Sequence, residues 1–128
     1  MAAIKSYTDL EQSKKLAEIL PIESADMKFP YFGNGQYGET ARVGEPIEFS
    51  GCKDIPCWSL TALLDLFPCS KESPIVNLTR GGWNPSFTRR WFATWEDENK
   101  NILYSCNGAS PVDAVVELIM KLDEQYIL

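Results

Sequence analysis

The sequence predicts an α+β protein, a single domain over residues 1–128 in which an antiparallel sheet of about three to five strands packs against three helices. Three observations support this prediction. Both ends of the chain carry helix-capping residues followed by apolar side chains at helical spacing, and the segment before the last helix has the alternation typical of strands. The 128 residues, 45% of them hydrophobic, also suffice to bury one core.

The first helix is predicted near residues 8–20. Thr8 and Glu11 have the spacing of a capping box, so Thr8 is expected to be the N-cap residue. Pro21 disfavours helical backbone in the residue before it and is expected to end the helix. The apolar stripe of this helix contains Leu10, Ala17 and Leu20.

Residues 26–55 are predicted to form a loose hairpin or a long surface loop. Residues 27–32 alternate enough for a short strand, and a turn region follows at Gly33, Gly35 and Gly38. The second helix is predicted near residues 56–67, because four large apolar side chains repeat there at helical spacing. These side chains are Leu60, Leu63, Leu64 and Phe67.

Strands are predicted near residues 75–79, 87–95 and 102–106, with the polar residues 96–101 turning the chain between the last two. Aromatic and β-branched residues are concentrated in the middle strand. Its alternation places four side chains on one face of the sheet, namely Arg89, Trp91, Ala93 and Trp95.

The last helix is predicted near residues 110–124. Ser110 is the expected N-cap residue, and Pro111 suits the first helical position because its missing N–H has no helical partner there. A continuous apolar stripe follows at Val112, Val115, Val116, Ile119 and Leu122.

Three blocks of the sequence resemble a family of small proteins from gut Bacteroidales genomes and their phages and mobile elements. The blocks are Thr8–Pro21 continuing to Glu23–Met27, then Pro56–Leu60 with Ala62–Leu64, and Pro111–Ala114. The layout is also similar to phage α–β–α sandwich domains. The resemblance implies a fold and a genomic setting, and it carries no catalytic residue onto this chain.

The absence of histidine argues against most enzyme classes. Histidine is the usual general base near neutral pH and the commonest nitrogen ligand for metals, and this chain contains none. The 12 basic and 18 acidic side chains give a net charge of −6, which disfavours binding to a phosphate backbone. We therefore expect a protein that is not an enzyme, with no cofactor and no nucleic-acid partner.

The four cysteines are expected to be free thiols. The sequence shows no signal peptide and no membrane-spanning stretch, which favours the cytoplasm, where thiols stay reduced. A zinc site is disfavoured, because the cysteines lack two closely spaced pairs. A nucleophilic thiol needs a lowered pKa, for which the start of the second helix offers one cause, at Cys57, but a catalytic role is disfavoured because no base partner is evident. The cysteines are Cys52, Cys57, Cys69 and Cys106.

Tryptophan and arginine are concentrated around the middle strand, and both are enriched at binding hot spots. The candidate binding residues are Trp83, Arg89, Trp91 and Trp95. In the alternative interpretation Trp91 and Trp95 pack beneath a helix as core residues, which is the common role of alternating aromatics in a strand. No metal ligands are predicted.

Binding to another, unidentified protein is thus the main functional hypothesis, for an accessory protein of a phage or mobile element. The alternative is a small-molecule or nucleotide-binding domain with a pocket between the sheet and the glycine-rich segment. Self-association would also account for the aromatic residues. A role as an acidic mimic of nucleic acid is disfavoured, because the acidic residues are spread along the chain.

Overall fold

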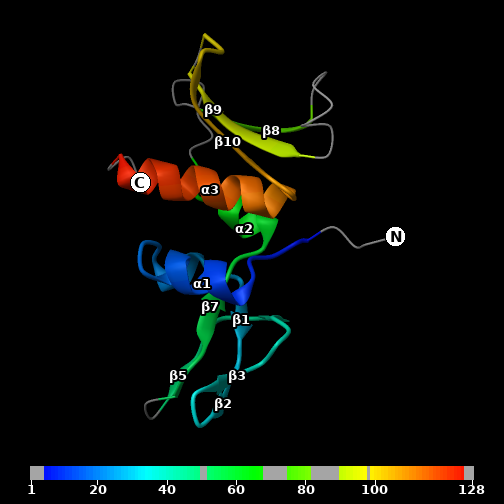
Figure 1. Ribbon diagram of the computed structural model, residues 1–128. Coiled ribbons are helices and arrows are strands. Elements are labelled where there is room, and N and C mark those ends of the chain that lie inside the picture. The colour runs from blue at the N-terminus through cyan, green and yellow to red at the C-terminus, as the bar shows by residue number, and fades with distance from the viewer. Residues whose placement is uncertain (1–4, 50–51, 68–74, 82–89, 98, 126–128) are drawn as a thin grey trace. The chain divides into compact units, whose positions relative to one another are not determined.

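The computed structural model describes residues 5–49, 52–67, 75–81, 90–97 and 99–125 (Figure 1). The chain is α+β, with antiparallel strands and the helices α1 (Leu10–Ala17), α2 (Leu60–Leu64) and α3 (Pro111–Glu124). The contacts divide it into two compact units. We call Tyr7–Ala62 the N-terminal unit, and the described part of Leu63–Leu128 with Lys5 and Ser6 the C-terminal unit. No helix in the described residues has both the length and the apolar character needed to cross a bilayer.

The N-terminal unit contains a three-stranded antiparallel sheet and two short hairpins. In the sheet, β1 (Met27–Phe29) lies between β4 (Arg42–Val43) and β7 (Ile55–Cys57). The hairpins pair β2 (Tyr31–Gly33) with β3 (Gln36–Tyr37), and β5 (Glu48–Phe49) with β6 (Cys52–Lys53).

The strands of the N-terminal unit are only two or three residues long, because glycine and proline interrupt the segment repeatedly. At the first turn, Gly33, Asn34 and Gly35 have φ values of 98°, 52° and 73°, a conformation that glycine and asparagine tolerate best. The sequence predicts one sheet. The structure instead divides the strands among separate sheets.

The first helix begins one residue later than predicted, with Asp9 rather than Thr8 as its N-cap. The Asp9 side chain accepts the Gln12 N–H at 2.8 Å, and the Gln12 side chain accepts the Asp9 N–H at 3.1 Å, which completes the capping box. Asp9 is exposed and Thr8 is buried, so the carboxylate satisfies the helix end from solvent while the threonine packs inside. The helix ends at Ala17, followed by turn residues up to the predicted end near residue 20.

The second helix is shorter than predicted, because its expected first turn is the strand β7. Residues 55–57 pair with β1 in the register Met27↔Cys57 and Phe29↔Ile55. Pro56 is tolerated because β7 is an edge strand of this sheet. Helix α2 starts at Leu60, and Ser59 caps it by accepting the Ala62 N–H at 3.1 Å.

The C-terminal unit contains a three-stranded antiparallel sheet in the order β10-β9-β8, with α3 along one face (Figure 1). The strands are β8 (Ile75–Arg80), β9 (Trp91–Glu96) and β10 (Ile102–Gly108). Residues 87–89 of the predicted middle strand lie outside the described residues. Helix α3 starts as predicted, with the Ser110 hydroxyl accepting the Asp113 N–H at 3.1 Å.

Gly108 joins the sheet to α3 at a close approach of two backbones. A Cβ atom on this glycine would lie 2.6 Å from Cβ of Asp113 and 2.7 Å from the backbone nitrogen of Ala114. Both distances are shorter than any ordinary carbon contact. A side chain at this position therefore requires the backbone to move.

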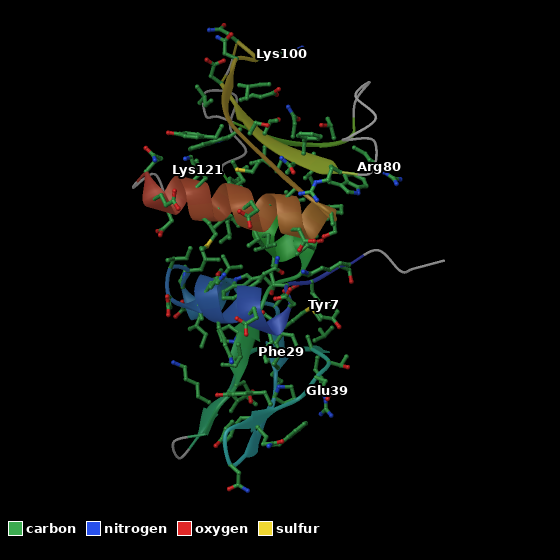
Figure 2. The ribbon with its side chains drawn as sticks, viewed as in Figure 1. Tyr7, Phe29, Glu39, Arg80, Lys100 and Lys121 are labelled. Carbon is green, nitrogen blue, oxygen red and sulfur yellow. The ribbon has the colours of Figure 1, made fainter. Side chains whose placement is uncertain are left out.

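Each unit has its own buried apolar residues. In the N-terminal unit, Met27, Phe29, Ala41 and Cys57 form a cluster against which Tyr7 packs. Figure 2 labels Tyr7 and Phe29, whose rings meet edge to face with centroids 6.5 Å apart. In the C-terminal unit, α3 has eight buried residues, at Pro111, Val112, Ala114, Val115, Val116, Leu118, Ile119 and Leu122.

Candidate functional site

The structure describes two of the four predicted binding residues, because Trp83 and Arg89 lie outside the described residues. Trp91 and Trp95 share one face of β9 with Ala93, as the alternation predicts. This face lies against α3: Ala93 is fully buried and pairs with Cys106, and the pKa of the Cys106 thiol is raised by burial and further by the charge of Glu117 on α3.

The two tryptophans differ in how far solvent reaches them. Trp95 is only 7% exposed and stacks on Tyr104, with ring centroids 6.2 Å apart. Its indole N–H is buried without a hydrogen-bond acceptor in the described part of the chain. Trp91 is half-buried, and the guanidinium of Arg80, labelled in Figure 2, lies 5.9 Å from its ring centroid. Trp91 and Arg80 are therefore the accessible part of this surface.

The N-terminal unit contains a buried polar cluster that the sequence did not predict, formed by Thr8, Ser13 and Cys57. The hydroxyls of Thr8 and Ser13 lie 2.8 Å apart, and the Cys57 thiol donates to the Thr8 carbonyl at 3.3 Å. The Thr8 hydroxyl also accepts the Trp58 N–H at 3.2 Å. The cluster ties the start of α1 to the end of β7, so its role is structural.

The surroundings of Cys57 do not provide the lowered pKa that an activated thiol needs. Burial raises its pKa, and the charge of Asp26 raises it further, whereas hydrogen bonds from Thr8 and Ser13 act in the opposite direction. The sequence suggested that a helix start would lower this pKa. That hypothesis is wrong, because Cys57 lies in β7, three residues before α2.

The raised pKa of Cys57 predicts a loss of stability in alkali. The fold favours the neutral thiol, so this contribution is complete below the ordinary pKa of 9.0 and is lost as pH rises through the higher folded-state pKa. We expect the free energy of unfolding to fall more steeply above pH 9 for the wild type than for Cys57→Ala. Urea unfolding at about pH 7, 9 and 10 measures the difference. Parallel curves for the two proteins would contradict the prediction.

A cleft of about 240 Å³ lies in the N-terminal unit between the second half of α1 and the segment 53–56. Its apolar lining comes from α1, from the turn after it and from β7. We call it the basic cleft, because two lysines line it as well. Its residues are Lys14, Ala17, Leu20, Ile22, Lys53, Asp54, Ile55 and Pro56.

Asp54 lines the basic cleft, but its carboxylate already has partners. One oxygen accepts the Tyr31 N–H at 3.0 Å and the other accepts the Ile47 N–H at 3.0 Å, with the Lys28 ammonium 3.8 Å away. Lys14 and Lys53 are exposed and make no ion pair within the described residues. The Lys14 ammonium lies 6.0 Å from the ring centroid of Tyr37. The two lysines are thus the charges that the cleft offers to a ligand.

A second cleft, of about 170 Å³, adjoins the first at Ile22 in the 3₁₀ helix η1 (Ile22–Ser24). We call it the acidic cleft, because Glu23 and Glu45 line it. Its other residues are Ile22, Ala25 and Pro46. No sequence motif joins these residues, because the walls of both clefts come from segments that are 20 or more positions apart in the chain.

Among the described residues, no group of three or more cysteine or acidic side chains is arranged to hold a metal ion. No family model, curated protein or solved structure matches the chain. The function must therefore be inferred from the geometry of the surfaces themselves.

Proposed function

We propose that the protein is a non-enzymatic accessory protein that binds a segment of another protein in the basic and acidic clefts. The observation that carries the proposal is that Ile22, an exposed apolar residue, lines both clefts, so a single bound segment that covers Ile22 has a cleft on each side of this contact. An extended chain suits two neighbouring clefts better than a compact ligand does, because different side chains of the chain can enter each cleft.

The dimensions also favour a peptide over a small molecule. The clefts measure about 240 and 170 Å³, whereas sites for small organic ligands usually enclose roughly 300–1,000 Å³. The alternative function, a small-molecule or nucleotide-binding domain, places its pocket between the sheet and the glycine-rich segment. None of Gly33, Gly35 and Gly38 lines either cleft.

A second binding surface is the one that the sequence predicts around Trp83, Arg89, Trp91 and Trp95. The pairing of Arg80 with the half-buried Trp91 supports it, because Arg and Trp are frequent at hot spots. The proposed setting, the cytoplasm of a cell that carries a phage or mobile element, is supported by the family resemblance.

Selection from a library of displayed random peptides, followed by affinity measurement with synthetic copies, tests the proposal. Ile22→Asp places a charge between the two clefts, and we expect it to weaken binding by about tenfold or more. Ile102→Asp is the matched control, because Ile102 is an exposed isoleucine of β10 that lines neither cleft. It should change the affinity by less than about twofold.

Thermal unfolding of each variant establishes that it is folded. Failure to select any peptide, or equal binding by wild type and Ile22→Asp, overturns the proposal. If the selected peptides are lost instead with Arg80→Ala/Trp91→Ala, the binding surface is the one on the C-terminal unit.

A further inference from the structure

The two clefts differ in the sign of their charge. Lys14 and Lys53 line one of them, and Glu23 and Glu45 line the other. Among the described residues, Asp54 is the one acid that lines the basic cleft, and it is held by two backbone N–H groups and lies near Lys28. An anionic group of a ligand in the basic cleft would therefore lie near the ammonium groups of Lys14 and Lys53, which have no acidic partner among the described residues.

This local positive charge contrasts with the chain as a whole, which carries a net charge of −6. Opposite charges a few ångströms apart attract more strongly at a partly dehydrated surface than in bulk water. The apolar lining residues Leu20, Ile55 and Pro56 provide such a surface beside the lysines. An acidic side chain with an apolar neighbour would be bound there in preference to a basic one.

The acidic cleft has the complementary preference. Glu23 and Glu45 are exposed and make no ion pair within the described residues, and Pro46 and Ala25 supply apolar contact beside them. A basic side chain of a bound segment would lie between the two carboxylates. Ile22 lines both clefts, so it would contact an apolar side chain of a segment that reaches the lysines and the glutamates at once.

We infer that the clefts select a partner segment in which an apolar side chain lies between an acidic and a basic one. The acidic residue enters the basic cleft, the apolar residue covers Ile22 and the basic residue enters the acidic cleft. This inference rests on the proposed function and names the partner chemistry. Charge pairing of this kind sets specificity more than total affinity, because segments with the wrong sign are repelled.

The test uses the selected peptides and a charge-reversed protein. Lys14→Glu/Lys53→Glu should lower the affinity for the tightest-binding peptide by about tenfold or more. The same variant should bind more tightly to a copy of that peptide whose acidic residue is replaced by lysine. Lys15→Glu/Lys100→Glu changes the net charge equally at exposed residues that line neither cleft. Figure 2 labels Lys100, in the turn after β9. The control should alter affinity by less than about threefold at physiological salt.

Dependence of binding on Ile22 tests the proposed function, and dependence on the charges of the two clefts tests the inference. Peptides that need Ile22 but show no order of charges, and that bind both double variants equally, overturn the inference and leave the function standing. Failure to select peptides overturns both. If Lys14→Glu/Lys53→Glu is not folded, Lys14→Gln/Lys53→Gln replaces it, and a loss of salt dependence relative to wild type is then the supporting result.

Discussion

Replacement of Trp58 by alanine is expected to cost about 3–5 kcal/mol of stability, the range measured for truncating large buried aromatic residues. Trp58 is fully buried, and its indole N–H donates to the Ser24 hydroxyl at 2.9 Å. Its backbone also exchanges hydrogen bonds with Thr8, whose N–H donates to the Trp58 carbonyl at 2.9 Å. Because domains are stable by about 5–15 kcal/mol, this single change removes much of the margin.

Urea unfolding of the whole protein, followed by circular dichroism, measures the cost. Trp58→Phe separates packing from hydrogen bonding, because it retains an aromatic ring but has no N–H group. In the Ser24→Ala background the hydrogen bond is already absent, so Trp58→Phe should cost about 1 kcal/mol less there than in the wild type. A cost below about 1 kcal/mol for Trp58→Ala would show that Trp58 does not hold the N-terminal unit together.

Replacement of Asp54 by alanine is expected to cost about 2–4 kcal/mol, because two backbone donors lose their acceptors. Asp54 lies between β6 and β7 and accepts the N–H groups of Tyr31 and Ile47, so one carboxylate joins β7 to both hairpins. The exposed Ile47 can bond to water instead, which keeps the cost below that of two fully buried donors.

Amide hydrogen exchange locates the effect, because the amide of Tyr31 should lose protection in Asp54→Ala. Asp54→Asn retains one acceptor oxygen and should lose about half as much stability as Asp54→Ala. Asp65→Ala is a matched control at an exposed aspartate and should stay within about 0.5 kcal/mol of wild type. Equal stability of Asp54→Ala and Asp65→Ala would exclude this role for Asp54.

The parts of the fold that sequence reasoning predicts well are those that local chemistry determines. Helix α3 starts at the predicted residue, because Ser110 and Pro111 act within one turn of the chain. The strand β10 also starts at the predicted residue, Ile102, because a polar turn directly precedes it.

The predicted element boundaries are wrong where the local sequence fits two structures equally well. Thr8 and Asp9 are both good N-cap residues, and the choice depends on Cys57, a residue 49 positions away that bonds to Thr8. Pro56 suits a first helical turn or an edge strand, and pairing with β1 decides between them. Such long-range partners leave no local pattern in the sequence.

The candidate clefts could not be predicted from the sequence, because their residues are also brought together only by long-range contacts. Lys14 and Lys53 come from a helix and a hairpin, and neither belongs to a motif. The aromatic residues of β9, by contrast, are close together in the chain and therefore form a pattern in the sequence. Trp95 shows that such residues also serve the interior of a unit, where the sequence alone does not distinguish them from a binding surface.

The close approach at Gly108 restricts which substitutions the protein tolerates at this position. Because the backbone of α3 occupies the space where a side chain would begin, the corner between β10 and α3 has no room for a larger residue. The direction in which the helix leaves the sheet is thereby set by main-chain packing. Related sequences that keep this corner should retain glycine there while the rest of β10 varies, so this position is a usable marker for recognising distant relatives.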